Sequence, residues 1–531
     1  MKIFSFFGNS NENTSYKDER NIYIGNINLD RLPGIEYEDI PGIFKRILHK
    51  RIDRLHPDNK KVITRFLKIN DRVTMENIVK RAIELDEKTA ALKLKEIMRE
   101  FSKRHKSIEE IFMRHFVRIE EKLKPEHRSL SKEKKLLIGS LFTLEYSNES
   151  VSLFNPSVVL YPKQNDLKKG QIRVIFSFRA TGEGHISSIV FRSAIIEKNN
   201  DIYLEPISRY ASTPQINLDP TYDKDHFKAK LKDINALDDI AASIMKDLPD
   251  KFTYNKLKEE IGKMTASLST QGKASLSFSI EEIKWLARSN YEVVFPPEHL
   301  ISERVIFPAS PTESNGIEDA RFVRFREDDG SHTYFATYTA YNGSVIMPQL
   351  LRTKDFHHFK MNTLNGPLAK DKGMALFPRK VNGKFAMLSR VDNENIYLMY
   401  SDNIYFWDEA KKIIEPREPW EFIKIGNCGS PIETKEGWIV LTHGVGPMRK
   451  YCIGVVLLDL NDPSKVIARL KQPLISPSEE EREGYVPNVV YSCGSILLND
   501  KLIIPYASSD SVSSIAVISL DELLRKLLSE K

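Results

Sequence analysis

The stretch Tyr334-Phe335-Ala336-Thr337-Tyr338 decides the fold class, because it is a short apolar and aromatic run of the kind that forms β-strands. Similar runs recur at residues 173–178, 385–388, 438–441, 453–458 and 502–506, with Gly, Asn or Asp near their ends. The pair Asn382-Gly383 precedes one of them and favours a hairpin turn. Residues 146–531 are therefore predicted to be mainly β, as a sandwich, a barrel or a propeller.

Two segments of the chain have a different, helical texture. Between residues 36 and 145, apolar residues recur at helical spacing, as at Ile78, Ala82 and Leu85, and charged residues fill the other positions. We therefore predict a helical N-terminal region over residues 1–145, with roughly three to five helices. A second helical pattern predicts an insertion between β elements at about residues 223–290, and residues 520–528 predict a terminal helix.

The composition excludes some classes of protein. The 531 residues include 79 basic and 73 acidic side chains, so the net charge of +6 is small and predicts no nucleic-acid partner. The sequence has no run of about 18 apolar residues and no signal-peptide pattern, so we predict no membrane span. Cys428, Cys452 and Cys493 are too scattered for a disulfide framework or a metal motif. These features favour the reducing cytoplasm.

Six groups of residues follow one another in a recognisable order: 154–158, 316–321, 376–384, 437–444, 457–464 and 487–494. In this order they resemble glycoside hydrolase family 130, the β-mannoside phosphorylases and β-mannosidases. The resemblance implies a five-bladed β-propeller with its active site at the central funnel, and it leaves the helical region and the insertion outside. The chain departs from the family pattern at Ala320, where the family has proline, and at residues 179–185 and 444–449.

Cleavage of a β-mannoside requires a carboxylic acid that protonates the leaving oxygen. By the resemblance, Asp319 in Gly316-Ile317-Glu318-Asp319-Ala320-Arg321 corresponds to the family's proton donor. Glu318 and Arg321 are then expected to bind the sugar, with Glu318 accepting from a hydroxyl or bracing an arginine. The alternative is that Asp319 only forms a local turn pair with Arg321.

A phosphorylase must also hold phosphate, which requires fixed cations and hydrogen-bond donors. The resemblance places Lys372, Arg390 and His443 at phosphate-binding positions, and Arg179 and, less strongly, Arg192 are further candidate cations. Each has a structural alternative: a solvated loop for Lys372, an ion pair with Asp392 or Glu394 for Arg390, and a buried core position for His443. An inverting hydrolase would instead need a second carboxylate roughly 6.5–9.5 Å from the acid.

The remaining candidates are polar residues near the expected propeller centre. Asn155, Tyr338 and Asp510 are predicted to bind substrate, although Tyr338 could equally be a core tyrosine. The sequence has no metal-ligand spacing and no nucleotide fingerprint, so no metal and no organic cofactor are expected. Inorganic phosphate is the expected co-substrate.

The leading function hypothesis is an inverting phosphorylase that converts a β-mannoside oligosaccharide and phosphate into α-mannose 1-phosphate. The first alternative is an inverting β-mannosidase, and the second is a glycan-binding propeller without catalysis. The helical N-terminal region is expected to pack on the β region and to offer a surface for homo-oligomerisation, because its apolar positions need a partner. The sequence does not specify the linkage or the acceptor sugar.

Overall fold

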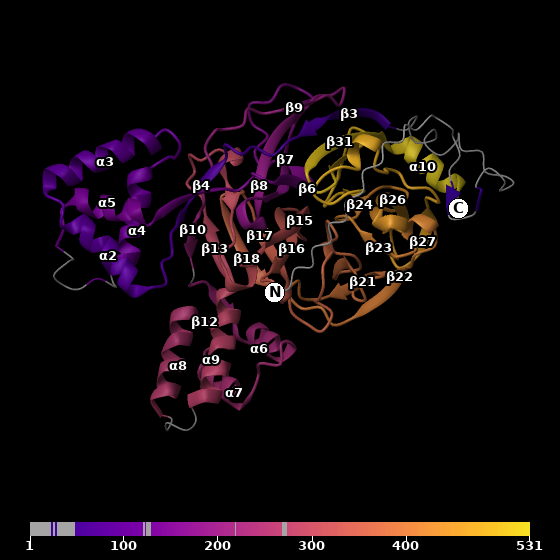
Figure 1. The fold of residues 1–531 in the computed structure, drawn as a ribbon. Coiled ribbons are helices and arrows are strands. Elements are labelled where there is room, and N and C mark those ends of the chain that lie inside the picture. Colours follow the sequence, from indigo (N-terminus) through magenta and orange to yellow (C-terminus); the bar gives the residue numbers. More distant parts are fainter. Residues whose placement is uncertain are drawn as a thin grey trace. The chain divides into compact units, whose positions relative to one another are not determined.

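The computed structural model describes residues 23–24, 27–28, 48–120, 123, 129–217, 219–267 and 273–530. The chain divides into residues 1–46 and residues 47–531, and the first unit is described only as the short pair β1 (Tyr23–Ile24) and β2 (Ile27–Asn28). The second unit is mainly β with groups of helices (Figure 1), which confirms the predicted fold class at this level. Among the described residues, no helix is long and apolar enough to cross a membrane.

The first β part contains two antiparallel groups of strands. One group contains β6 (Ser152–Leu160), β7 (Ile172–Thr181), β8 (Ser187–Ile196), β9 (Ile202–Leu204) and β14 (Val305–Ile306). The other contains β15 (Gly316–Arg326), β16 (His332–Tyr341), β17 (Ile346–Thr353), β18 (His358–Thr363), β13 (Tyr291–Val294) and β10 (Gln215–Asn217). The two groups are joined only where Gly316 meets Ser187 in a parallel bridge, so the nominal 11-stranded sheet is nearly interrupted there.

Three further antiparallel sheets follow along the chain. The first contains β19 (Ala375–Leu376), β20 (Phe385–Ser389), β21 (Ile396–Ser401) and β22 (Ala410–Ile414). The second contains β23 (Lys424–Asn427), β24 (Ile432–Glu433), β25 (Trp438–Val445), β26 (Tyr451–Leu458) and β27 (Val466–Arg469), and the third β28 (Val490–Tyr491), β29 (Ile496–Leu498), β30 (Lys501–Ser508) and β31 (Val512–Ser519). Asn382 and Gly383 both have positive φ, of 52° and 79°, which agrees with the predicted hairpin turn.

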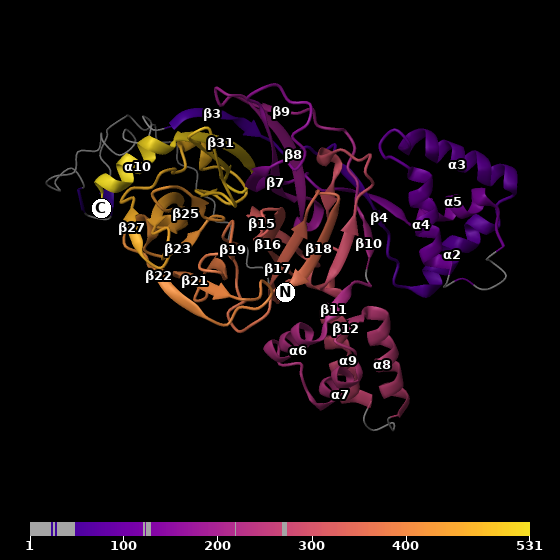
Figure 2. The same ribbon diagram turned by 180° about the vertical axis from the view of Figure 1, so that it is seen from behind.

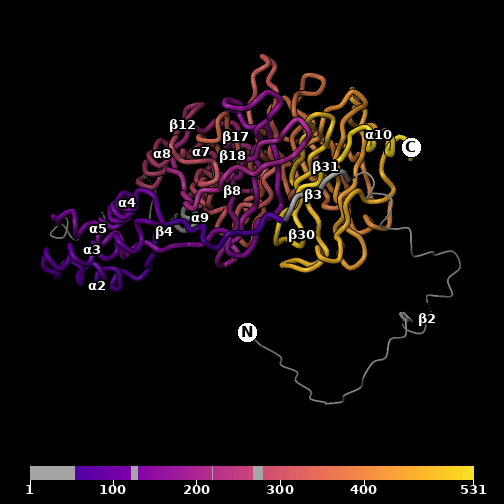
Figure 3. Tube along the Cα trace, turned by 90° about the horizontal axis from the view of Figure 1, so that it is seen from above, coloured from indigo at the N-terminus to yellow at the C-terminus, as the bar shows by residue number. Residues whose placement is uncertain are grey.

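The last sheet receives a strand from the start of the chain. Strand β3 (Leu48–Leu55) pairs antiparallel with β31, and Figure 3 shows the two side by side. Residues 48–55 fall within the region predicted to be helical, so this prediction is wrong for them. The reason is that four of these eight residues are charged, which hides the strand pattern and is typical of a strand at a sheet edge.

The expected helices are present in the described chain. The N-terminal group contains α2 (Arg72–Ile83), α3 (Glu87–Phe101), α4 (Ile108–Glu120) and α5 (Lys132–Leu141), with Asp71, Asp86 and Ser131 as N-caps of α2, α3 and α5. The insertion contains α6 (Lys224–Asp233), α7 (Asp239–Asp247), α8 (Tyr254–Ser267) and α9 (Lys273–Arg288), grouped near the pair β11 (Thr221–Asp223) and β12 (Lys251–Thr253) (Figure 2). Helix α10 (Leu520–Ser529) ends the described chain.

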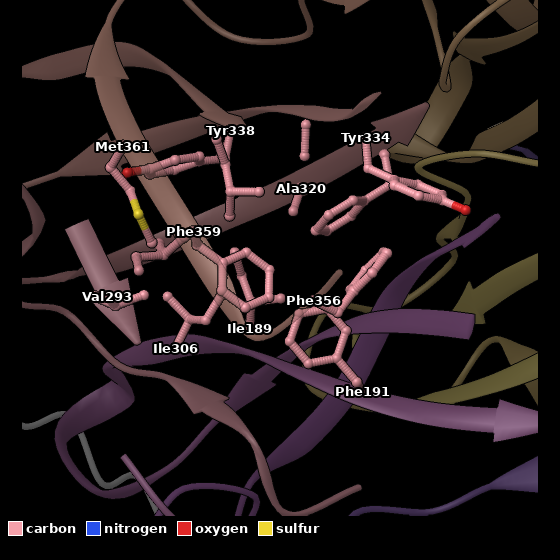
Figure 4. Close-up of a cluster of buried hydrophobic side chains, with 14 of the residues drawn as sticks. Ile189, Phe191, Val293, Ile306, Ala320, Tyr334, Tyr338, Phe356, Phe359 and Met361 are labelled. Carbon is pink, nitrogen blue, oxygen red and sulfur yellow. The ribbon is translucent and has the colours of Figure 1, made fainter. Parts of the chain in front are cut away.

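One predicted sugar-binding residue, Tyr338, lies in the hydrophobic core (Figure 4). Its side chain is buried, and its hydroxyl donates to Glu313 Oε1 at 2.8 Å. Glu313 is itself buried and also accepts from the Tyr291 hydroxyl at 2.9 Å. The structure therefore corrects the prediction for Tyr338, because this tyrosine satisfies a core carboxylate and does not line a site.

Lys61, in the turn between β3 and β4 (Val62–Phe66), ties the N-terminal region to the β core. Its ammonium group is buried and donates to the carbonyls of Ser208, of Tyr210 at 3.0 Å and of Ser302 at 3.2 Å. Burial lowers the pKa of Lys61 to about 8. Removing the ammonium would leave three carbonyl groups without their donor.

We expect Lys61→Met to lower the free energy of unfolding by roughly 2–4 kcal/mol, because the variant keeps the apolar stem and removes the donor. Urea unfolding monitored by tryptophan fluorescence would measure the change. The exposed neighbour Lys60 provides the control, and Lys60→Met should have almost no effect. Equal effects of the two substitutions would show that Lys61 anchors nothing.

Candidate active site

A cavity of about 390 Å³ lies where residues from every large group of strands converge. Strands β6, β7, β15, β17, β23, β25, β26 and β28 and the turns between strands supply its walls. The polar lining residues are Asn155, Arg179, Glu318, Asp319, Asp371, Lys372, Arg390, Asn393, Lys424, His443, Arg449, Tyr451, Tyr491 and Asp510. The cavity therefore brings together eight residues that the sequence analysis singled out: Asn155, Arg179, Glu318, Asp319, Lys372, Arg390, His443 and Asp510.

Three of these residues have an uncommon backbone conformation. Asn155, Asp319 and Asp510 have positive φ, of 47°, 52° and 51°. The strand register shifts at the first two, between Phe154 and Ser157 in β6 and between Glu318 and Arg321 in β15. Left-handed non-glycine residues cost free energy and are concentrated at functional sites. A regular strand would turn alternate side chains away from the cavity, and these irregularities bring the three polar side chains into it.

Asp319 lies among cations and donors. Asn155 Nδ2 donates to its Oδ1 at 2.7 Å, and Arg179 Nη1 lies 3.5 Å from the same oxygen. Burial alone would raise the pKa of Asp319, but Arg179, Arg321 and the Asn155 amide together hold it below its ordinary value. The carboxylate is therefore ionised at neutral pH in the absence of ligand.

Glu318 binds two of the predicted phosphate ligands. Its Oε1 accepts from Arg179 Nη2 at 2.9 Å, and its Oε2 accepts from Lys372 Nζ at 2.5 Å. Arg179 is also stacked on the ring of Phe154, with 5.0 Å between the guanidinium carbon and the ring centre. In this state the charges of Arg179 and Lys372 are largely balanced by carboxylates.

Arg390 and His443 form a second, cationic side of the cavity. Arg390 Nη1 donates to His443 Nε2 at 3.4 Å, and its Nε to the carbonyl of Lys372 at 3.4 Å. Asp392, the predicted alternative partner of Arg390, is occupied by Asn395 and Tyr397 instead. His443 is fully buried, and burial together with Arg390 and Arg321 holds its pKa well below the ordinary value, so the ring is neutral.

The tautomer of His443 follows from its neighbour, because Arg390 can only donate and Nε2 must accept. The ring proton then lies on Nδ1, and a hydrogen bond to the Asn427 backbone favours protonation of this ring. His443 therefore lines the cavity as a neutral ring.

Lys424 and Arg449 are cavity residues that the sequence analysis missed. Lys424 begins β23, and its Nζ donates to Asn393 Oδ1 at 3.3 Å. Burial and the nearby Arg390 lower the pKa of Lys424. Within the described residues, neither Lys424 nor Arg449 forms an ion pair with a carboxylate. No local signal distinguishes Lys424 among the 79 basic residues of the chain, whereas Arg449 ends the segment 444–449 in which a departure from the family pattern was noted.

Two predicted residues lie outside the cavity. Arg321 is buried and donates to the carbonyls of Asp319 and Cys428, each at 2.9 Å, and to the Tyr491 hydroxyl at 2.8 Å. Arg192 is buried against Glu149, at 2.7 and 2.8 Å. The structure therefore corrects the expectations that Arg321 binds sugar and that Arg192 is a site cation, because internal acceptors already occupy both guanidinium groups.

Asp510 lies in the turn between β30 and β31. Burial raises its pKa to about 6, and the neighbouring Asp319 acts in the same direction while Arg179 opposes it. Near neutral pH this carboxyl group therefore exchanges its proton more readily than an ordinary aspartate does. The described residues contain no group of three or more His, Cys, Asp and Glu side chains arranged to hold a metal ion.

We expect Asp510→Asn to stabilise the protein above about pH 7 by on the order of 1–3 kcal/mol. The folded-state pKa of Asp510 is about 6, above the ordinary value of 3.8. The stability that Asp510 contributes is therefore present at low pH and lost as the pH rises through 6, and asparagine avoids that loss. Urea unfolding at pH 5 and pH 8 would measure the difference, with the exposed Asp408→Asn as control. An equal gain at both pH values would contradict the assignment.

Known proteins resemble parts of this chain. A family model described as beta-1,4-mannooligosaccharide phosphorylase matches residues 277–529. A 1,2-beta-oligomannan phosphorylase from a Thermoanaerobacter species is 36% identical over 219 residues, which is 40% of this chain and 71% of that protein. A beta-1,2-mannobiose phosphorylase from the same source is 34% identical over 223 residues, 40% of this chain and 70% of that protein.

A solved structure of a beta-1,2-mannobiose phosphorylase from Listeria innocua in complex with beta-1,2-mannobiose aligns with a TM-score of 0.43 and 20% identity. The alignment covers 72% of this chain and 93% of that chain. From the family model and the sequence relatives, the chain belongs to glycoside hydrolase family 130.

Proposed function

We propose that this enzyme catalyses the phosphorolysis of β-mannosides, transferring a mannosyl group to inorganic phosphate and releasing α-mannose 1-phosphate and a shortened acceptor. One observation carries the proposal: Arg390, Lys424 and the neutral His443 converge in the same cavity as Asp319. Phosphate carries nearly two negative charges and is bound by such combinations of cations and donors. The names of the relatives also support phosphorolysis, and they favour β-1,2-linked mannosides as the first substrates to test.

The cationic side of the cavity is where phosphate would bind. Lys424 and Arg390 have no carboxylate bound to them in the described structure, and the neutral His443 ring lies beside Arg390. Lys372 is held near this side of the cavity by its ion pair with Glu318. A bound phosphate could therefore also accept a hydrogen bond from the Lys372 ammonium group. Phosphate in this position would attack the anomeric carbon as an anion and would need no protein base.

Asp319 would supply the proton to the leaving oxygen. Its low pKa in the free enzyme means that the proton must be acquired in the complex. A phosphate dianion bound nearby raises the pKa of a neighbouring carboxylate through charge repulsion. The proton balance then closes, because the hydrogen phosphate that becomes α-mannose 1-phosphate gives up the proton that restores Asp319.

Hydrolysis is the second candidate, and Asp510 is the observation that favours it. A carboxylate with a pKa of about 6 in the same cavity could activate water as a general base. Water attack would not require the group formed by Arg390, Lys424 and His443. Phosphate dependence of product formation separates the two reactions.

We also propose that the strands form the five blades of a β-propeller around the cavity. Three observations support this arrangement: the single bridge that divides the 11-stranded sheet, the three four- or five-stranded sheets, and the pairing of β3 with β31. The proposed domain division remains residues 1–145 and 146–531. Homo-oligomerisation through the helical region and a cytoplasmic location remain predictions.

Asp319→Asn should reduce kcat by about 10²–10⁴-fold and leave the fold intact, because the amide keeps the size and removes the acid. Release of α-mannose 1-phosphate from a β-1,2-mannobiose substrate would measure the loss, and a thermal melt would check folding. A loss of only a few-fold would rule out Asp319 as the proton donor.

Lys424→Ala and Lys372→Ala should each raise the KM for phosphate, by about tenfold or more for the loss of one charge-assisted contact. The effect of Lys424→Ala should be the larger, since Lys372 is balanced by Glu318. The exposed Lys411→Ala is a matched control on another sheet. Release of free mannose at an equal rate with and without phosphate would contradict phosphorolysis.

A further inference from the structure

Two turns that follow cavity-lining strands share one unusual backbone conformation. The first follows β7 at Gly182, and the second follows β25 at Gly446. The φ and ψ angles are −119° and −155° at Gly182, and −116° and −158° at Gly446. Two left-handed residues complete each turn: Gly184 and His185 in the first, and Met448 and Arg449 in the second, with φ between 55° and 66°.

The left-handed conformation is easy for Gly184 but strained for His185, Met448 and Arg449. Strain of this kind, about 1 kcal/mol or more for each residue, persists where the position of the side chain matters. Both turns belong to segments, residues 179–185 and 444–449, for which a departure from the family pattern was expected from the sequence. The two turns thus share one backbone geometry although their residues differ.

The first turn holds an aromatic side chain in place. The rings of His185 and Tyr485 are stacked, with centres 5.4 Å apart and an interplanar angle of 22°. The Tyr485 hydroxyl lies 3.2 Å from His185 Nδ1, and the Tyr485 backbone N–H donates to Ser511 Oγ at 2.8 Å. Yet the tyrosine remains 52% exposed, so it is fixed on one side and open on the other.

These residues adjoin the cavity. Val486 and Asp510, the chain neighbours of Tyr485 and Ser511, both line it. Arg449, from the second turn, lines it as well and forms no ion pair with a carboxylate in the described chain. The phosphate ligands proposed above are buried deeper, since Arg390 and His443 are almost inaccessible to solvent, whereas Arg449 and Tyr485 are exposed.

We propose that His185, Arg449 and Tyr485 form the binding site for the acceptor sugar, the part of the mannoside that leaves. The inference rests on the proposed phosphorolysis. An oligosaccharide acceptor must extend toward solvent, so its site lies at the exposed edge and not beside the buried phosphate ligands. A fixed aromatic ring offers a rigid apolar face at little entropic cost, and an unpaired guanidinium donates to hydroxyl groups.

The test uses the reverse reaction of the full-length enzyme, in which α-mannose 1-phosphate and an acceptor release inorganic phosphate. Mannose, glucose, β-1,2-mannobiose and β-1,4-mannobiose serve as acceptors. Tyr485→Ala should raise the acceptor KM by about tenfold and leave the KM for α-mannose 1-phosphate within about twofold. Tyr485→Phe keeps the ring and should stay close to the wild type, and Arg449→Ala should also raise the acceptor KM.

Tyr203→Ala is the matched control, since Tyr203 is 56% exposed and lies on β9 away from the cavity residues. An acceptor KM in Tyr485→Ala equal to that of Tyr203→Ala overturns the proposal, and so does an equal rise in both KM values. If the wild type releases no phosphate with any acceptor, the proposed phosphorolysis fails. Calorimetric binding of β-1,2-mannobiose to wild type and Tyr485→Ala then decides the acceptor site separately: weaker binding to the variant supports it, and equal binding overturns it.

Discussion

The buried guanidinium group of Arg321 is the contact on which the geometry of the cavity depends. It joins three separate pieces of backbone, because it starts in β15 and donates to the carbonyl of Cys428 after β23 and to the hydroxyl of Tyr491 in β28. Its third bond, to the carbonyl of Asp319, fixes the left-handed residue that presents the proposed acid. A buried charge is tolerated only when its donors are satisfied, so these elements must meet in one arrangement.

The wall of the cavity that contains Arg390 and His443 depends on two glycines, because a side chain at either position would collide with Arg390. A Cβ at Gly426 would lie 2.5 Å from Arg390 Cδ and 2.5 Å from His443 Cε1, and a Cβ at Gly373 would lie 2.7 Å from Arg390 Nε. Gly373 also has a φ of 92°, which other residues rarely adopt. The cations can approach one another because two glycines leave room for Arg390. Each wall of the cavity is thus set by local packing before any ligand binds.

The sequence predicted much of this site because its chemistry lies in recognisable segments. Asp319, Lys372 and His443 each stand in a short motif, and the strands that hold them are plain apolar runs. Lys424 and Arg449 were not predicted as site residues, because a single cation at a strand end or in a turn resembles any solvated one. Other errors concern Arg321 and Tyr338, whose polar atoms suggested substrate contacts but are satisfied by protein groups. Strand β3 was not predicted, because half of its residues are charged. Its partner strand β31 also lies more than 450 positions away in the sequence, and no local pattern encodes such a pairing.

The charge balance of the cavity connects structure and proposed reaction. Glu318 and Asp319 together balance the charges of Arg179 and Lys372 in the ligand-free protein, so these cations are not left without a partner. Arg390 and Lys424 lack such a partner, and their mutual repulsion is a standing cost that an anion would relieve. Phosphate binding would therefore gain most on the Arg390 side, while its charge would raise the pKa of Asp319 across the cavity. One electrostatic change would thus both bind the nucleophile and prepare the acid, which is the physical reason to couple the two steps.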